Sequence, residues 1–451
     1  MVLRRFADFA VTQRDTALPP DVTHAATRAV VDWFAATIPG ADMAPARILR
    51  ETLADELGDG PARLVPDGVR ARPRTAALIN STASHTAELD DIYREGLYHP
   101  GSPTVAAALA AAEVVGASGP AVLRAVAVGY EIGDRIAAAV QPDHYTFWHT
   151  TGTVGTIGAA AAAAEILGLD ADRFTHALAT ATTMAAGLQQ AFRSDAMSKP
   201  LHAGHAAEQG LLAAMAAARG LTGATDVLDG PAGFGAAMSG RPDWDAAVAE
   251  LGRPWCITRA TVKNHSCCGH TFAAVDAALA LRAEGVRAAD VREIRVGTYS
   301  TATKVAGNSD PKTDFEAKFS IAYCVAAALH LGSVRLAAFT DERLGDPVIR
   351  ALMTRTTLDV DPQFDEGFPG MRAARVVVVD SAGVEHAYVR MTRKGDPDDP
   401  LTDAELRAKF TDLVAPVLGA DRCDALGTAL WNLAELADVR RLGAEPAGAP
   451  A

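Results

Sequence analysis

The chain has 451 residues, of which 49% are hydrophobic and 22% charged, a composition that excludes a disordered or low-complexity protein. Its net charge of -13 repels a phosphate backbone, so we expect no nucleic-acid partner. The first fifteen residues break at Asp8 before any apolar run, and the longest uncharged stretches are rich in Thr, Gly and His. We therefore expect no signal peptide, no membrane partner and a cytoplasmic location.

The amino-terminal part of the sequence has the period of packed helices. From Thr23 to about Ala260, apolar residues recur at steps of three and four, and several of these runs end in glycine. Aromatic residues are only 6% of the chain, and small apolar side chains favour closely packed helices. Gly152, Gly155 and Gly158 form a GxxGxxG on an Ala-rich helix, which indicates packing more than phosphate binding.

The pattern changes after about Ala260. Residues 291–300 alternate like a half-buried strand, and residues 374–393 predict a hairpin with a Ser-Ala-Gly turn from Ser381. A helix is predicted between them, over residues 319–332. Beyond Lys394 the helical period returns, with Thr402 and Glu405 as a capping box.

These patterns predict a mostly α fold with an α+β insertion. The large all-helical domain would form from both chain ends, residues 1–260 and 396–451. Residues 261–395 would form a smaller α+β lid domain.

The sequence lacks the usual motifs of metal, nucleotide and hydrolase sites. It contains no HExxH, GxxxxGK[ST], GxSxG or GxGxxG. Its five cysteines include no CxxC pair, so neither a disulfide framework nor a zinc or iron–sulfur ligand set is supported. We therefore expect no metal.

Two clusters in the first half of the chain combine polar groups with apolar surroundings. Glu88, Asp90 and Asp91 precede His99, and such carboxylates beside a loop histidine suit acid–base chemistry, although an acidic helix end in solvent has the same pattern. His149 stands just before a Gly/Ala helix whose free N–H groups attract an anion, but it could equally be a histidine of the core.

Two further clusters contain lysines. Lys199 precedes Pro200 at the start of a very apolar helix, where it could bind a carboxylate or lie on the surface. Lys263, Cys268 and His270 lie just ahead of another helix, and an anion-binding helix start explains them more simply than a metal, because ligand spacing is irregular.

Taken together, these clusters resemble the MmgE/PrpD family, which includes 2-methylcitrate dehydratase, cis-aconitate decarboxylase and iminodisuccinate epimerase. The resemblance runs in the family's order over about residues 85–406 and rests on HTAELDD with HPGS, WHTTGTVG, MSKPLHAGHAAEQGLLAA, CCGHTFAAVDA, EAKFSIAYCVAAAL and KGDPDDPLTDAEL. It implies a homodimer and chemistry on di- or tricarboxylates without a cofactor.

The resemblance also implies roles for single residues in catalysis. His149 and His99 are the acid–base candidates, and Tyr323 is a hydrogen-bond donor or proton relay. Asp90 and Asp91 would orient or tune His99, or act as the base.

The substrate-binding candidates are Lys199, Lys263 and His270. In the decarboxylase branch a further histidine follows the second lysine, but the same offset falls on Cys268 here, and His270 is the nearest candidate. The first acid of the family's H-x-x-D-x-D-D motif is Glu88 in this chain.

The function that we expect from the sequence is a cofactor-independent lyase. The first choice is a hydro-lyase that abstracts an α-proton from a 2-methylcitrate-like hydroxy acid. The alternatives are an epimerase of an iminodicarboxylate, a cis-aconitate-type decarboxylase and a non-catalytic carboxylate-binding homologue. In the enzymes, cations and a helix N-terminus would stabilise an enolate-like transition state.

Overall fold

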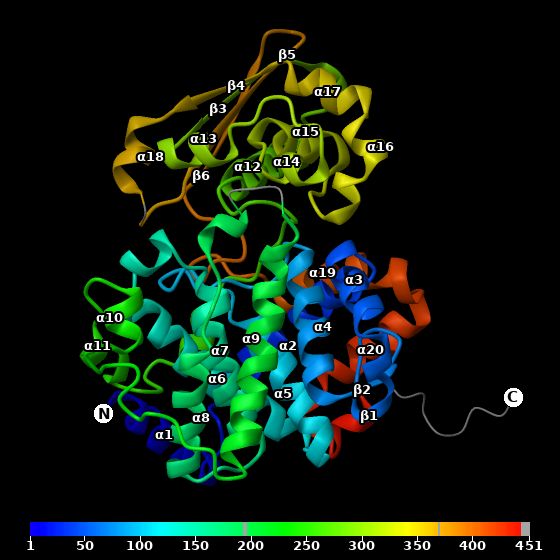
Figure 1. Cartoon of the computed structure of the whole chain (residues 1–451). Helices are drawn as coiled ribbons and strands as arrows, with labels where there is room; N and C mark the ends of the chain where they lie inside the picture. The colour runs from blue at the N-terminus through cyan, green and yellow to red at the C-terminus, as the bar shows by residue number, and fades with distance from the viewer. Residues whose placement is uncertain (193–195, 369, 443–451) are drawn as a thin grey trace, which may run out of the picture. The chain divides into compact units, whose positions relative to one another are not determined.

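The structure is a computed structural model that describes residues 1–192, 196–368 and 370–442. Its contacts divide the chain into two compact units (Figure 1). The helical unit comprises Met1–Thr261 and the C-terminal segment that starts at Thr402, and the α+β unit comprises Val262–Leu401. The predicted class, mostly α with an α+β insertion, is confirmed.

Thirteen α-helices and one short hairpin make up the described part of the helical unit. The hairpin pairs β1 (Leu57–Arg63) with β2 (Arg70–Ala71) in antiparallel fashion. The helices are α1 Val2–Thr12, α2 Pro20–Gly40, α3 Ala44–Thr52, α4 Pro73–Thr86, α5 Gly101–Val115, α6 Gly119–Ala139, α7 Thr150–Ile166, α8 Ala171–Thr183, α9 Ser198–Ala217, α10 Phe234–Met238, α11 Trp244–Val248, α19 Asp403–Leu418 and α20 Ala420–Trp431.

Helix α7 is the centre of the helical unit. It packs against α5, α6, α8 and α9, and every residue from Thr150 to Glu165 is buried. Its glycines permit the close approach: an added Cβ would lie 2.4 Å from the Ala186 carbonyl oxygen at Gly152 and 2.9 Å from the Tyr98 hydroxyl at Gly158. The GxxGxxG therefore serves helix packing, as the sequence predicts.

The C-terminal segment closes the helical unit against its N-terminal part. Figure 1 shows α19 and α20, in orange and red, beside the blue α2. The predicted capping box of Thr402 and Glu405 starts α19. Further along α19, the buried Lys409 ammonium lies 2.5 Å from Asp32 Oδ1 on α2 and donates to the Leu89 carbonyl at 2.9 Å. An ion pair inside the core thus ties both ends of the chain to the loop after α4.

The α+β unit is built on a four-stranded sheet in the order β4-β3-β5-β6. Strand β3 (Val291–Thr298) pairs antiparallel with β5 (Ala374–Asp380) and parallel with the edge strand β4 (Thr356–Val360). Strands β5 and β6 (Glu385–Arg390) form the predicted hairpin.

Two helices of the α+β unit pack on its sheet. Helix α12 (Phe272–Ala283) lies against β5 and β6, and α15 (Ile321–Leu331) packs on α12 and contacts β4. The remaining helices are α13 Ser300–Ala306, α14 Asp314–Lys318, α16 Asp341–Leu344, α17 Pro347–Met353 and α18 Pro362–Gly367. Within the described ranges, no helix is both long and apolar enough to cross a membrane.

Candidate active site

Four histidines form a continuous row of imidazoles inside the helical unit. His85 lies in the last turn of α4, His99 precedes α5, His149 caps α7, and His202 lies on α9. Their ring centroids are separated by 4.9 Å (His85–His99), 5.5 Å (His85–His149) and 5.2 Å (His149–His202). Segments that are far apart in the sequence therefore meet at one polar cluster.

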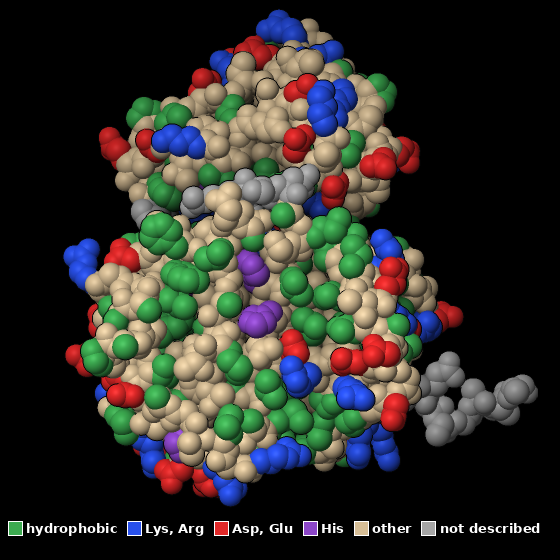
Figure 2. Space-filling model, in the orientation of Figure 1, with side chains coloured by type: hydrophobic (Ala, Val, Ile, Leu, Met, Phe, Trp, Pro, Cys, Tyr) green, Lys and Arg blue, Asp and Glu red, His purple; other side chains and the backbone are tan. Residues whose placement is uncertain are grey.

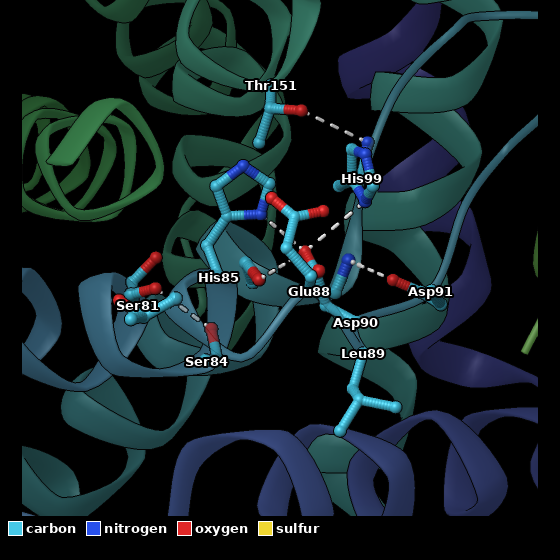
Figure 3. A network of polar contacts seen from close by, with 12 residues as sticks. Ser81, Ser84, His85, Glu88, Leu89, Asp90, Asp91, His99 and Thr151 are labelled. Atoms are coloured by element: carbon cyan, nitrogen blue, oxygen red, sulfur yellow. Dashed lines mark hydrogen bonds and ion pairs between the residues drawn. The ribbon is translucent and has the colours of Figure 1, made fainter. Parts of the chain in front are cut away.

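Asp90 is the common acceptor at one end of this row (Figure 3). Its Oδ2 lies 2.6 Å from His85 Nδ1 and 3.3 Å from His99 Nδ1, and it accepts the Ser102 hydroxyl at 2.9 Å. Burial by itself would raise the pKa of Asp90, but the two histidines hold it well below its usual range. An ionised carboxylate thus orients two imidazoles.

The two imidazoles at the other end of the row, those of His149 and His202, are neutral. Burial lowers the pKa of His149 well below its usual range, with contributions from His85 and Lys199, and it lowers the pKa of His202 to about 4. Their Nδ1 atoms are 3.0 Å apart, so one of them donates the hydrogen bond and the other accepts it. A neutral, oriented imidazole can take up a proton, which is the requirement for a general base.

Asp91 has a different environment from its neighbour. The Tyr130 hydroxyl donates to its Oδ2 at 2.7 Å, and the Gly101 N–H donates to its Oδ1 at 2.9 Å. Burial raises the pKa of Asp91 to about 7 in spite of these bonds. An added Cβ on Gly101 would lie 2.7 Å from Asp91 Oδ1, so this carboxyl is packed tightly at the start of α5. Of the two aspartates, Asp90 contacts His99 and Asp91 anchors α5 to α6.

Lys199, in the first turn of α9, forms an ion pair with Glu88. Both side chains are 15% exposed. Figure 3 shows the Glu88 side chain pointing towards the histidine row from the loop after α4. The sequence motif contained Glu88, His85 and His202, but nothing in their spacing indicated that they would join His99, His149 and Lys199.

In the α+β unit, the structure pairs His270 with a tyrosine that sequence reasoning missed. His270 Nδ1 lies 2.8 Å from the Tyr299 hydroxyl. Burial lowers the pKa of His270 to about 4 and raises that of Tyr299 to about 12. Tyr323 is fully buried and donates to the Ala338 carbonyl at 2.7 Å. The hydroxyl that reaches His270 is therefore that of Tyr299.

The K-G-D-P segment, residues 394–397, supports the loop that carries Lys263. The Val262 N–H donates to the Gly395 carbonyl at 2.9 Å, and an added Cβ on Gly395 would lie 1.9 Å from the Val262 oxygen. Gly395 also has a φ of +102°, which other residues rarely adopt. Lys263 is itself 97% buried, since its exposed fraction is 3%. The glycine thus fixes the backbone beside this lysine.

Arg393 extends this support to the loop before α12. It forms two hydrogen bonds with Asp396, at 2.9 and 2.8 Å, and a third with the Gly269 carbonyl at 3.1 Å. His265 Nε2 lies 2.9 Å from Asp276 Oδ1 on α12. These bonds hold the loop of residues 263–270 against the helix that follows it.

His85, Asp90 and His99 place one potential metal-binding atom each within 4.8 Å of one another. Tetrahedral zinc with bonds of about 2.0–2.2 Å would keep its ligand atoms about 3.3 Å apart. The 2.6 Å between His85 Nδ1 and Asp90 Oδ2 is too short for that and suits a hydrogen bond. The donor geometry therefore fits a proton-handling cluster better than a zinc site.

We predict that chelation leaves the activity intact. If the site is catalytic, the protein treated with EDTA and desalted should keep its turnover, because Asp90 acts on the two imidazoles directly. Elemental analysis of the same sample provides the control. Stoichiometric metal whose removal abolishes turnover would contradict this prediction.

A cavity of about 300 Å³ lies elsewhere in the helical unit, between the β1–β2 hairpin, α5 and the C-terminal helices. Its walls include Arg63, Glu113, Leu426 and Leu442. Arg63 is already paired with Glu113, at 2.6 Å. Among its described lining residues there is none of the predicted site residues, so the cavity is separate from the histidine row.

Comparison with known proteins gives matches over both units. The MmgE/PrpD N-terminal domain matches residues 4–247, and the MmgE/PrpD C-terminal domain matches residues 265–433. The cis-aconitate decarboxylase-like protein oryM of Aspergillus oryzae is 28% identical over 98% of this chain and 96% of its own length. Cis-aconitate decarboxylase of Aspergillus terreus is 26% identical over 94% of this chain and 91% of its own length. The human cis-aconitate decarboxylase is 28% identical over 83% of this chain and 79% of its own length.

Proposed function

The chain belongs to the MmgE/PrpD family and is an enzyme of the lyase class, and on this premise we propose that it decarboxylates a small polycarboxylic acid of the cis-aconitate kind. The observation that carries the proposal is the polar row in the helical unit, where the ionised Asp90 holds two imidazoles and the neutral His149 lies beside Lys199. The curated relatives move the first choice from the dehydration expected from the sequence to decarboxylation.

Loss of CO₂ leaves an electron pair on carbon, and the enzyme has to stabilise it. A neighbouring carboxylate conjugated with that carbon takes up the charge as an enolate, and cations held against this carboxylate lower the barrier. We propose Lys199 and Lys263 as these cations. A protonated histidine beside Asp90 then supplies the proton that forms the new C–H bond.

The roles of the two ends of the row follow from their charges. His99, next to the ionised Asp90, is the proposed proton donor. His149, neutral at the start of α7, is the proposed base of the alternative dehydration, which removes an α-proton, whereas decarboxylation removes none. His270, hydrogen-bonded to Tyr299, is the proposed third contact to a substrate carboxylate.

Dehydration of a 2-methylcitrate-like acid remains the second candidate, and one observation favours it. The position at which the decarboxylase branch has a histidine holds Cys268 here. A neutral base such as His149 also suits removal of an α-proton before hydroxide departs. Proton removal and return without a leaving group would be the epimerase reaction at the same row.

The products distinguish these reactions. We would incubate the full-length protein separately with cis-aconitate and with 2-methylcitrate, measure CO₂ release, and analyse the products by NMR. Decarboxylation gives CO₂ with the first acid, whereas dehydration gives an alkene from the second without CO₂. His149→Ala should abolish dehydration while substrate binding remains, and His99→Ala should abolish decarboxylation. Binding without turnover by the unmodified protein would leave only the carboxylate-binding alternative, and neither binding nor turnover would contradict the proposal.

We further propose a homodimer formed through the helical unit. Four large apolar side chains near the histidine row are exposed, Phe147 (68%), Leu188 (57%), Met197 (58%) and Leu201 (37%). Figure 2 shows hydrophobic side chains and histidine side chains exposed on one face of this unit. An exposed apolar patch of this kind marks a protein interface.

Sedimentation at micromolar concentration should give twice the chain mass of 46.9 kDa. Leu188→Asp with Met197→Asp should yield monomer, because two charges would be buried without partners. Val384→Asp, at a side chain 52% exposed in the β5–β6 turn, is the matched control and should leave the dimer intact. A monomeric unmodified protein would count against this interface.

A further inference from the structure

We propose that the cavity of about 300 Å³ in the helical unit binds an amphiphilic carboxylate, with the hydrocarbon chain inside the cavity and the carboxylate at its mouth. The cavity lies between the β1–β2 hairpin, α5 and the C-terminal helices, which are neighbours in Figure 1. Its described lining residues include no member of the histidine row, so the inference is independent of the proposed function.

The volume of the cavity suits a ligand of moderate size. Clefts that bind small molecules begin at about 300 Å³. An apolar cavity of about 150 Å³ holds one benzene ring, so a volume of 300 Å³ has room for about a dozen non-hydrogen atoms. Linear carboxylates of about eight to ten carbon atoms have this size.

The walls of the cavity are largely apolar. They include Phe34, Leu109, Leu418, Leu426 and Val439, which come from α2, α5, α19, α20 and the segment that follows α20. A hydrocarbon chain gains free energy when it leaves water for such walls, and each buried methylene raises the affinity about fourfold.

The polar groups inside the cavity are already hydrogen-bonded within the protein. Arg63 donates to Glu113 at 2.6 Å. It also donates to the carbonyls of Val439 and Leu442, at 3.0 and 2.9 Å. The Asn80 amide donates to the Arg63 carbonyl at 2.9 Å. With these groups paired, the interior favours the apolar part of a ligand.

Two arginines lie where the cavity opens to solvent. Arg422 on α20 and Arg441 both line the cavity and are exposed. Within the described residues, their guanidinium groups form no hydrogen bond or ion pair. Asp438 lies close enough to Arg441 to have its pKa lowered by it, but it is paired with Arg440 at 2.6 Å. Both arginines can therefore receive an anion from solution.

The acids of the lining do not cancel this positive charge. Asp67 is paired with Arg50, and Glu113 is paired with Arg63. The mouth thus carries a local excess of positive charge on a chain whose net charge is -13. Guanidinium groups bind carboxylates through charge-assisted hydrogen bonds, so apolar walls below two arginines match a carboxylate with a hydrocarbon chain.

Calorimetry with a series of linear carboxylates tests this inference on the full-length protein. We expect one decanoate to bind per chain, and the affinity should fall about fourfold for each methylene removed towards octanoate and hexanoate. 1-Octanol has the chain length of octanoate but no charge, and it should bind about tenfold or more weakly than octanoate.

Three variants locate the ligand. Arg422→Gln combined with Arg441→Gln should weaken octanoate binding about tenfold or more and leave 1-octanol binding unchanged, because only the carboxylate meets the arginines. Arg241→Gln is the matched control, at an exposed arginine of the helical unit outside the cavity lining, and it should change neither affinity. Ala425→Trp places a large side chain at an exposed position of the lining and should block both ligands. Melting temperatures establish that each variant is folded.

Four results would overturn the inference. The first is no binding of decanoate by the unmodified protein, and the second is binding that neither the arginine pair nor Ala425→Trp weakens. The third is competition by propane-1,2,3-tricarboxylate, which would place the ligand at the histidine row. The fourth is binding that appears only on dilution, or only in a chain that ends at Leu442, since another part of the protein would then occupy the cavity. The proposed function is judged separately, by turnover of the polycarboxylic acids.

Discussion

Replacing Asp90 by Asn should lower kcat about 100-fold or more, with little change in KM or melting temperature. The ionised Asp90 accepts from His85 and Ser102 and lies 3.3 Å from His99, and an amide in its place would present a donor to one of these groups. The imidazoles would lose both their orientation and their anionic partner. General acid–base catalysis of this kind contributes about 10²–10⁴-fold in rate.

The pH profile separates this role from a merely structural one. In Asp90→Asn, the limb of the kcat profile that reports the protonated histidine should move to lower pH, because the imidazolium has lost its anionic partner. Asp91→Asn is the matched control: its side chain contacts Tyr130 and Gly101, so stability should change and kcat much less. Equal losses of kcat in the two variants would contradict the assignment of Asp90.

Asp91 also predicts the sign of a pH effect on stability. The pKa of Asp91 is raised in the folded state to about 7, above its value in an unfolded chain of about 3.9. Its contribution to stability is therefore fully present below about pH 4 and is lost as the pH rises towards 7. Asp91→Asn removes this dependence. Between about pH 4 and 7 we therefore expect the free energy of unfolding to fall less steeply in Asp91→Asn than in the unmodified protein, and urea denaturation at several pH values measures the two slopes.

Lys409→Ala should lower the free energy of unfolding by about 3–5 kcal/mol, as breaking a buried ion pair from one side does. Lys409 has no exposed side-chain surface and Asp32 only 2%. Removal of the ammonium leaves Asp32 as a buried carboxylate without its cation and takes a donor from the Leu89 carbonyl. Urea denaturation monitored by circular dichroism measures the loss.

A double variant and a surface pair provide the comparison. Asp32→Asn with Lys409→Met should be more stable than Lys409→Ala alone, because no uncompensated charge remains. Lys312→Ala removes a lysine that is 69% exposed and paired with Asp310, and it should change stability by less than about 1 kcal/mol. A loss at Lys409 no greater than that at Lys312 would show that the buried pair contributes little.

Local patterns in the sequence predicted much of the fold. The period of three to four residues gave the helices, and the alternation after Ala260 gave β3 and the β5–β6 hairpin. The capping box of Thr402 and Glu405 was predictable because it depends only on two residues that are three positions apart in the sequence. Strand β4 was missed: it is short, lies at the edge of the sheet, and pairs with β3 from about sixty residues away.

The site was predicted only in part, since its geometry depends on tertiary contacts. His85 and His202 are 117 residues apart, and only the packing of α4, α7 and α9 brings them into one row with His149. From the sequence, Tyr323 was named as a hydrogen-bond donor, and Tyr299 was not considered. Tyr323 lies in the core of the α+β unit, whereas Tyr299 directly follows β3 and lies beside His270, a difference that no spacing encodes.

The ion pair between Lys409 and Asp32 has a consequence for the order of events during biosynthesis. A ribosome releases Asp32 and the loop with Leu89 some three hundred residues before Lys409, and the whole α+β unit emerges in between. During that interval the nascent helical unit holds a carboxylate without its cation and lacks two of its helices, α19 and α20. The polar row can therefore reach its final form only after Lys409 and α19 have left the ribosome, and a chain truncated within the α+β unit should be retained by chaperones as an unfinished helical unit.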